Sequence, residues 1–352
     1  MSSRLFPLLG ALAVSACASQ PDDGVEAEGS TATLHGEDET DGGAEGWHTA
    51  LELGPEVGAL YSVWGPSVDA LYAVGGQTLS DRTTHAALLR FDGTDWNRVE
   101  LPAETPKLHW VFGVQDLRFV VGDRGTILVR RGDDDAEPWT LADCGTQLPL
   151  WGVWGAAPDD VWIVGGDGFH RPPVLCHFDG RDFTPVSPPE LSVRSRAFFK
   201  VWGLSPGDVW LVGHLGVILH YDGSTWVEQS SGTSAALISL WGSSADEILA
   251  VGGHSDGVLA RYDGSTWTTQ PVLEGTGLNG VWMGADGEAV VVGAHGFVSR
   301  VAPGSLEPTV EDGLTRLLLH ATFSVDGRTF AVGGTIDEAP PWRGIVLERS
   351  AL

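Results

Sequence analysis

The sequence predicts an all-β fold, a seven-bladed β-propeller with four-stranded blades, and two observations carry this prediction. First, the chain of 352 residues repeats itself from residue 47 onward, and its seven Val-Gly doublets lie on average 43 residues apart between Gly75 and Gly333. Second, each repeat consists of short alternating or β-branched blocks bounded by Gly, Asp or Pro, and no stretch keeps a helical period. Four antiparallel strands of this length form one propeller blade.

Each repeat presents four blocks in the same order, and each block predicts one strand. The first block ends on an aromatic residue, followed by Gly in most repeats: Trp64, Phe112, Trp154, Trp202, Trp241 and Trp282. The second block ends in Val-Gly, at Gly75, Gly122, Gly165, Gly213, Gly252, Gly293 and Gly333. The third block ends in Asp-Gly in four repeats, which is typical of a tight hairpin. The fourth begins with an aromatic residue: Trp96, Trp139, Phe183, Trp226 and Trp267.

The seventh repeat supplies only three strands, the last of them over residues 344–349. The missing fourth strand should begin with an aromatic residue. Residues 47–53 precede the first repeat, begin with Trp47 and resemble residues 96–101. We therefore expect the N-terminal strand to complete the last blade, because closure of the ring in this way leaves no blade unpaired.

Residues 1–16 are expected to be a lipoprotein signal peptide. Arg4 gives a positive start, and the apolar run from Leu5 to Val14 is too short to span a bilayer. Small residues then precede Cys17, as in the bacterial lipobox, where signal removal leaves an acylated cysteine. We expect Cys17 to be lipidated; ordinary secretion with an incidental thiol at Cys17 is the alternative.

Residues 17–46 are expected to be an acidic, disordered tether that carries the lipidated cysteine. From residue 18 to residue 46 the chain has nine Asp and Glu and no Lys or Arg, so it repels itself and stays extended. Specific cation binding by these acids is the alternative. The propeller then occupies residues 47–352. The whole chain has a formal charge of −27, which excludes a nucleic-acid partner because few basic groups can replace phosphate counterions.

The repeat text also resembles known propellers. The Val-Gly-Gly segments at 74–76, 164–166, 251–253 and 332–334, which in the first, third and fifth repeats are followed by Tyr/Phe-Asp and then Trp or Phe, resemble kelch repeats. Residues 121–128 (Val-Gly-Asp-Arg-Gly-Thr-Ile-Leu) are more similar to propellers of the photosystem-assembly-factor and sialidase-repeat type. Such blades behind a lipobox resemble surface lipoproteins of myxobacteria. The resemblance implies an exported protein, lipid-anchored in the bacterial cell envelope at the outer membrane, where it faces either the periplasm or the cell surface.

The recurring aromatic residues and aspartates have a structural interpretation and a functional one. An aromatic side chain repeated in every blade is expected to pack between blades, although aromatic faces also stack on sugars. Aspartates recur at the turns between first and second strands and are expected to stabilise those turns; a calcium site is the alternative. They are Asp69, Asp116, Asp160, Asp208, Asp246, Asp286 and Asp326. We expect no cofactor, with calcium as the alternative.

Long loops on one face give the candidate ligand-binding residues. The loops 76–86, 166–173 and 334–343 and the connection 184–197 carry the candidates, which are Arg82, His170, Arg171, Arg194, Arg196, Trp342 and Arg343. In so acidic a molecule they predict a local cationic surface that accepts a carboxylate, a phosphate or an acidic sugar. The alternative is that arginine simply populates exposed loops.

Two further groups are weaker candidates. His214, His254 and His295 follow the second strand in three successive repeats and could ligate zinc, but no pair has close ligand spacing. Cys144 and Cys176 remain after lipidation. An exported compartment permits a disulfide between them, and the sequence leaves it open whether they are bridged.

Enzyme signatures are missing from the sequence. It has no Gly-x-Ser-x-Gly elbow, phosphate loop, His-Glu-x-x-His or Cys-x-x-Cys, and all four tyrosines lie in predicted framework strands. We therefore expect no catalytic residues and a monomeric module that binds an envelope protein or a glycan and meets the membrane only through its lipid. The alternative is a glycosidase or lyase acting on polysaccharide, with Arg171, Arg194, Arg196 and His170 near the chemistry.

Overall fold

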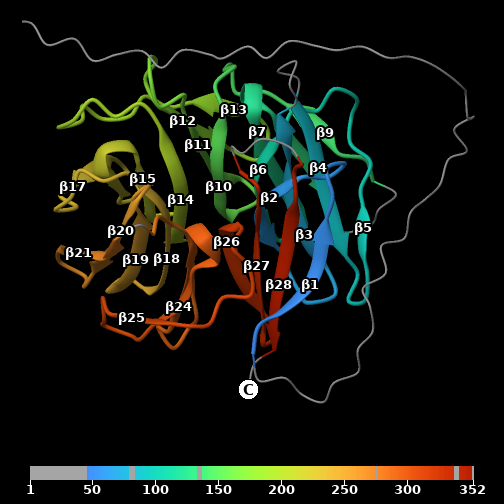
Figure 1. Ribbon diagram of the computed structural model, residues 1–352. Helices are drawn as coiled ribbons and strands as arrows, with labels where there is room; N and C mark the ends of the chain where they lie inside the picture. Colours follow the sequence, from blue (N-terminus) through green and yellow to red (C-terminus); the bar gives the residue numbers. More distant parts are fainter. Residues whose placement is uncertain (1–45, 79–83, 133–136, 275, 337–340, 351–352) are drawn as a thin grey trace, which may run out of the picture. The chain divides into compact units, whose positions relative to one another are not determined.

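The computed structural model describes residues 46–78, 84–132, 137–274, 276–336 and 341–350. Its strands form seven four-stranded antiparallel sheets, and the only helical elements among these residues are three 3₁₀ turns of three residues each. The sheets follow one another as the blades of a propeller (Figure 1). The prediction of a seven-bladed propeller with four strands in each blade is confirmed.

The blades are numbered here in chain order, and each blade is given from its inner strand to its outer strand. Blade 1 comprises β2 (Ala59–Trp64), β3 (Leu71–Thr78), β4 (Thr84–Phe91) and β5 (Trp96–Arg98). Blade 2 comprises β6 (Leu108–Val114), β7 (Leu117–Gly122), β8 (Ile127–Arg131) and β9 (Thr140–Ala142). Blade 3 comprises β10 (Leu150–Ala157), β11 (Asp160–Gly165), β12 (Val174–Phe178) and β13 (Phe183–Pro185). Blades 4 and 5 comprise β14 (Phe198–Ser205), β15 (Asp208–Gly213), β16 (Ile218–Tyr221) and β17 (Trp226–Gln229); and β18 (Leu237–Ser244), β19 (Glu247–Gly252), β20 (Asp256–Tyr262) and β21 (Trp267–Glu274). Blades 6 and 7 comprise β22 (Leu278–Met283), β23 (Ala289–Gly293), β24 (Val298–Val301) and β25 (Pro308–Val310); and β26 (Leu318–Val325), β27 (Arg328–Gly334), β28 (Gly344–Ser350) and β1 (His48–Leu53).

The N-terminal strand completes the last blade, as predicted. β1 pairs antiparallel with β28, from His48 opposite Glu348 to Leu53 opposite Gly344. Figure 1 shows the blue β1 beside the red β28. Leu51 and Leu53 of β1 are buried in the core shared by blades 7 and 1, so the strand contributes apolar surface as well as backbone hydrogen bonds.

Glu311 ties this closing strand to blade 6. It accepts hydrogen bonds from Trp47 Nε1 (2.6 Å), Arg300 Nε (2.6 Å) and Arg349 Nη1 (2.8 Å). Burial alone would raise the pKa of Glu311, but the hydrogen bonds from Arg300, Trp47 and Arg349 outweigh burial and hold that pKa below its usual value. One carboxylate therefore joins residues next to both ends of the propeller to the neighbouring blade.

The Trp-Gly pairs of the inner strands pack against one another where blade 1 meets blade 2, where blade 3 meets blade 4 and where blade 4 meets blade 5. A Cβ atom on Gly203 would lie 2.8 Å from Cη2 of Trp154, and one on Gly242 would lie 2.8 Å from Cη2 of Trp202. The indole of one blade thus occupies the space that the glycine of the next blade leaves free. Sequence repetition predicts the pair, and inter-blade packing explains why its second member has no side chain.

The aromatic residues at the start of the outer strands also pack between blades. Trp226 contacts Trp162 of the preceding blade edge to face, with ring centroids 5.1 Å apart, and Trp267 contacts Trp210 in the same way at 5.7 Å. All four tryptophans of this position, Trp96, Trp139, Trp226 and Trp267, are buried. The packing interpretation of these aromatic residues is confirmed.

Replacing Gly203 with Ala should therefore destabilise the propeller. The new Cβ would lie 2.5 Å from the Asp208 carbonyl oxygen as well as against Trp154, and such overpacking costs about 2 kcal/mol. Urea unfolding of the purified protein measures the loss. The matched control is Gly207→Ala in the adjoining turn, where the nearest atom is 3.6 Å away and little change is expected. Equal stability of the two variants would show that packing between these blades does not require a glycine at position 203.

The predicted Asp-Gly hairpins are confirmed, and their aspartates organise the turns. Asp222 Oδ1 accepts hydrogen bonds from the Ser224 hydroxyl (2.7 Å) and from the backbone N–H groups of Ser224 (2.9 Å) and Thr225 (2.8 Å). These bonds, with the Ser224 hydroxyl as the largest cause, lower the pKa of Asp222 to about 2. The backbone N–H of Thr266, followed by the Ser265 hydroxyl, lowers the pKa of Asp263 to about 2 in the same way.

These two turns predict a small acid-dependent loss of stability. A carboxyl whose pKa is lower in the folded state stabilises the fold above its ordinary pKa of 3.8, and that contribution is lost as the pH falls toward 2. The double variant Asp222→Asn/Asp263→Asn should show a shallower fall of the unfolding free energy between pH 4 and pH 2. Denaturant titrations across this window measure it; an unchanged slope would contradict the assignment.

A disulfide joins blades 2 and 3. Cys144, which follows β9, and Cys176 on β12 are bonded through their sulfur atoms, and their Cα atoms are 6.6 Å apart. Both residues are buried in the core between the two blades. The bridge therefore adds a covalent link at one blade boundary.

Candidate functional site

The candidate site lies where blade 3 meets blade 4, on the face that carries the loops between second and third strands. In antiparallel blades these loops share a face with the connections from one blade to the next. The loop between β11 and β12 covers residues 166–173, as predicted, and the connection from β13 to β14 covers residues 186–197. We call this connection the strap.

A capped turn shapes the loop between β11 and β12. Asp167 Oδ1 accepts the backbone N–H groups of Phe169 (2.8 Å) and His170 (2.9 Å). These bonds, that to Phe169 first, lower the pKa of Asp167, so the carboxylate stays charged and keeps the turn closed. The turn holds the side chain of Phe169 outward, 78% exposed.

The strap is bound to both blades. On the blade 3 side, Arg196 Nη1 donates to the His170 carbonyl (2.7 Å), and Gly168 N donates to the Arg196 carbonyl (3.3 Å). On the blade 4 side, the backbone N–H of Ser192 donates to Glu228 Oε2 (2.7 Å) and its hydroxyl to Glu228 Oε1 (2.8 Å). The strap and the loop it touches therefore form one supported surface.

Three apolar side chains are exposed on this surface, together with two arginines. Val193 on the strap is 37% exposed, and Leu215 in the turn after β15 is 36% exposed. These two residues line a hollow of about 370 Å³ beside residues 228–234. Two arginines are also exposed: Arg171 lies two residues after Phe169 in the chain, and Arg194 follows Val193. We call Phe169, His170, Arg171, Val193, Arg194 and Leu215 the blade 3–4 surface.

The structure brings together only part of the predicted cationic surface. Four of the predicted residues lie close together: His170 and Arg171 on the loop, and Arg194 and Arg196 on the strap. The Arg196 side chain donates a hydrogen bond to the loop. Trp342 and Arg343 lie in blade 7, which is separated from the blade 3–4 surface by two blades on either side of the ring. Arg343 Nη2 is 3.6 Å from Glu52 Oε2 on β1.

Arg82 lies outside the described residues. The predicted bounds 76–86 of its loop are wrong. β3 and β4 extend through both ends of that range, with Gly76 opposite Ala86 and Thr78 opposite Thr84, so the connecting loop is shorter than predicted. A ligand-binding role for the other candidates stays a prediction.

His214, His254 and His295 lie in the turns after the second strands of blades 4, 5 and 6. Among the described residues, no group of three His, Cys, Asp or Glu side chains is placed to hold a metal ion. Two aspartates of the first turns contact groups in their own blades: Asp208 Oδ1 accepts from Trp210 Nε1 at 2.8 Å, and Asp160 Oδ1 is 2.6 Å from His177 Nε2. Asp326 of blade 7 instead accepts the backbone N–H of Val68 in blade 1.

A ring of residues at the inner strands escaped the sequence analysis. Every inner strand has a register shift near its start, at Tyr61, His109, Trp151, Phe199, Ile238, Asn279 and His320. Rings from neighbouring blades meet there: His109 stacks on Trp151 with centroids 4.1 Å apart, and Tyr61 lies 4.9 Å from His320. In the sequence these residues share one repeat position, after the first apolar residue of each inner strand. The residue type at this position varies from blade to blade, so it forms no visible motif.

Two basic groups are buried beside this ring. Burial, with nearby Lys107, lowers the pKa of His109 to about 3, so His109 is neutral at pH 7 although Asp123 Oδ1 lies 3.3 Å from its Nε2. Lys200 is 2% exposed, its Nζ lies over the ring of Trp110, and burial lowers its pKa well below the usual value. These groups are enclosed by protein and do not open onto the blade 3–4 surface.

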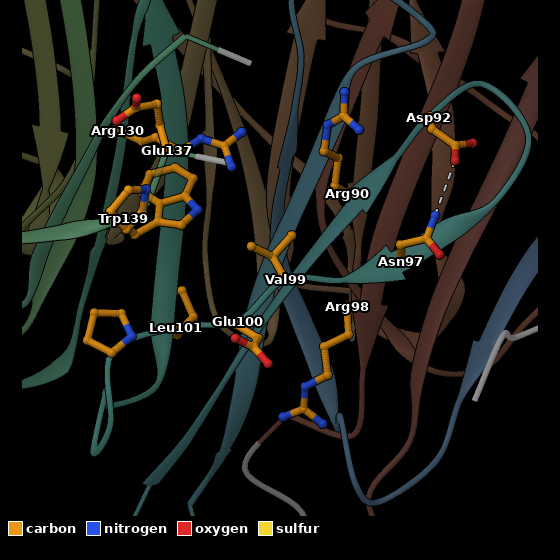
Figure 2. A pocket seen from close by; sticks show the side chains of 12 residues that line it. Arg90, Asp92, Asn97, Arg98, Val99, Glu100, Leu101, Arg130, Glu137 and Trp139 are labelled. Atoms are coloured by element: carbon orange, nitrogen blue, oxygen red, sulfur yellow. Dashed lines mark hydrogen bonds between the residues drawn. The ribbon is translucent and has the colours of Figure 1, made fainter. Parts of the chain in front are cut away.

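A second hollow, of about 580 Å³, lies between the outer parts of blades 1 and 2. Figure 2 shows Arg130 and Trp139 on one side of it and Arg98 on the other. Arg130 is buried and lies 5.0 Å from the ring of Trp139. The hollow is lined by three arginines and three carboxylates: Arg90, Arg98, Arg130, Asp92, Glu100 and Glu137. Because the two charges balance, this hollow does not select an anion.

No protein-family model and no curated protein matches the sequence. Solved structures do match: YCF48 bound to a D1 peptide, at 12% identity over 87% of this chain and 97% of that one, with a TM-score of 0.62. The WD40 propeller domain of Doa1 matches at 12% identity over 86% and 97%, with a TM-score of 0.63. The likeness is one of fold.

An extracellular domain also has this fold. It belongs to a protein described as a hybrid two-component system of B. thetaiotaomicron and matches at 12% identity over 86% of this chain and 40% of that one, with a TM-score of 0.59. In the part of the chain that the structure describes, no helix is long and apolar enough to cross a membrane. At these identities the comparisons support a β-propeller and do not assign an activity.

Proposed function

We propose that this chain is a lipid-anchored, extracytoplasmic interaction module that binds a protein of the cell envelope through the blade 3–4 surface. The observation that carries the proposal is the side chain of Phe169, held 78% exposed by the Asp167 turn and supported by Arg196. An exposed apolar group on a rigid base, flanked by arginines, is the composition of a binding hot spot.

The same residues favour a protein over a glycan. Sugar sites use flat aromatic faces, whereas two of the three exposed apolar residues here, Val193 and Leu215, are aliphatic. Aliphatic side chains beside Arg171 and Arg194 suit a polypeptide with apolar and acidic groups. The similar YCF48 fold was solved with a D1 peptide, which supports the capacity of such a propeller to hold a polypeptide.

The lipid anchor rests on the signal sequence and on Cys17. Labelled palmitate should be incorporated into the full chain expressed in a bacterial host that processes lipoproteins, and Cys17→Ser should abolish both the label and sedimentation with membranes. A Cys17→Ser chain that keeps its label would contradict the anchor and leave the binding proposal standing.

Binding is tested with a chain beginning at residue 46 as bait on native envelope extracts. We expect an envelope protein to be retained by the wild type and lost with the triple variant Phe169→Ser/Arg171→Ser/Arg194→Ser. Val310→Ser, a similarly exposed apolar residue in blade 6, is the matched control and should retain it. If the triple variant retained the envelope protein as well as the wild type does, the proposed site would be wrong. If the wild type retained a polysaccharide instead of a protein, a glycan ligand would be favoured.

A further inference from the structure

Leu215 has an unfavourable backbone conformation for its residue type. Its φ and ψ are 60° and 31°, in the left-handed region where a residue with a Cβ atom is disfavoured because Cβ crowds the following carbonyl oxygen. The corresponding turns of blades 2 and 6 have the same form and place Arg124 (56°, 31°) and His295 (58°, 29°) there. Only at Leu215 is the strained residue apolar.

The turn imposes this conformation whatever residue occupies position 215. The backbone N–H of Gly213 bonds the Val217 carbonyl (3.0 Å), and that of His214 bonds the Ala197 carbonyl at the end of the strap (2.9 Å). A Cβ atom on Gly216 would lie 2.1 Å from the Thr233 carbonyl, so the next residue is pressed against the following connection. Glycine or asparagine at 215 would fit the same backbone with less strain.

Leucine at this position therefore lowers the stability of the fold in two ways, through its left-handed backbone and through the exposure of an apolar side chain. Its side chain also lines the hollow of about 370 Å³ together with Val193. A residue that opposes stability while it lines a supported hollow is typical of a binding position.

The surroundings of the hollow indicate what it binds. Its volume lies near the lower end for ligand sites, so it accepts a few side chains rather than a folded domain. Ser192, Ser231 and Thr233 contribute polar groups to its wall, and the Glu228 carboxylate also lies there, with both of its oxygens accepting hydrogen bonds from Ser192. Arg194 follows Val193 on the strap, and Arg171 lies two residues after Phe169 in the same loop. In a chain of formal charge −27 these arginines complement acidic groups rather than basic ones.

Resting on the proposed function, we propose that the blade 3–4 surface binds an extended acidic peptide of its partner, with an apolar side chain in the hollow against Leu215 and Val193. Carboxylates of the peptide face Arg171 and Arg194, and a second apolar side chain contacts Phe169. Leu215 contributes affinity at the expense of fold stability.

The test uses random twelve-residue peptides displayed on phage and selected on a chain beginning at residue 46. The expected consensus combines acidic residues with at least one large apolar residue. A synthetic copy of the selected peptide should bind Leu215→Asn and Arg171→Ser/Arg194→Ser at least tenfold more weakly than wild type. Leu215→Asn should also unfold one or two degrees higher, because asparagine tolerates the left-handed backbone better than leucine.

Arg124→Asn is the matched control, because it relieves the same left-handed strain in blade 2, away from the surface. It should raise the unfolding temperature and leave peptide affinity unchanged. The proposal fails if basic or uncharged peptides are selected, if no peptide is enriched over the Leu215→Asn variant, or if that variant is stabilised without weaker binding. If the peptide test fails, the envelope pull-down with the same preparation separates two cases. When the wild type still retains an envelope protein, only the peptide proposal has failed. When it retains none, the proposed function has failed too.

Discussion

A chain that begins at Gly54 is expected to lose the cooperative fold of a chain that begins at Gly46. The missing strand, β1, supplies the outer edge of blade 7 and buries Leu51 and Leu53. Each buried leucine contributes about 1.5–3 kcal/mol, and the ladder to β28 and the bond from Trp47 to Glu311 add to this. The sum, about 5 kcal/mol or more, approaches the whole stability of many domains.

Circular dichroism and urea unfolding of the two chains measure this effect. Removing residues 1–45 serves as the control, because the propeller begins after them, and it should leave the unfolding midpoint unchanged. A peptide of residues 46–54 added to the shorter chain should restore part of the lost stability. The role of β1 in closure would be refuted by a chain from Gly54 that unfolds at the same midpoint as the longer one.

Opening the disulfide between Cys144 and Cys176 is expected to have the second largest effect. The bond closes a loop across 32 positions of sequence, and chain-entropy estimates for such a loop give about 3–4 kcal/mol. Unfolding of the oxidised and the reduced wild type measures the difference.

The variant Cys144→Ala/Cys176→Ala separates the bond from other effects of the reductant. Its stability should match that of the reduced wild type to within the small cost of the side-chain change, and reductant should not alter it further. Identical unfolding of the wild type with and without reductant would show that the bond does not form in the protein in solution.

Most of the fold could be predicted from the sequence because its signals are local and repeated. An Asp-Gly turn such as that at Asp222 is set by hydrogen bonds within four residues. The position of β1 followed from counting strands, since a repeat that lacks its outer strand must take one from elsewhere. The ends of the strands were harder to predict. The extension of β3 to Thr78 depends on pairing with Thr84, which the flanking residues do not specify.

The candidate site was predictable only in part. Loop length identified residues 166–173, and the arginines on them are visible in the sequence. The outward placement of Phe169 depends on the local turn that Asp167 caps and on the bond from Arg196 that ties this loop to the strap. The left-handed backbone of Leu215 depends on contacts with the strap and with the following connection, which no local pattern encodes. The grouping of Arg343 with Arg171 failed because residues on similar loops are neighbours only when their blades are adjacent.

The pairing of β1 with β28 also determines how the molecule responds to mechanical load. Under the proposed lipid anchor, any pull between the membrane and a captured partner would enter the ring through the residues just before His48. The strand that seals the ring would then bear the tension first, and its rupture would expose the edge of β28. The bonds from Trp47 and Arg349 to Glu311 lie at this entry point, where they would resist peeling.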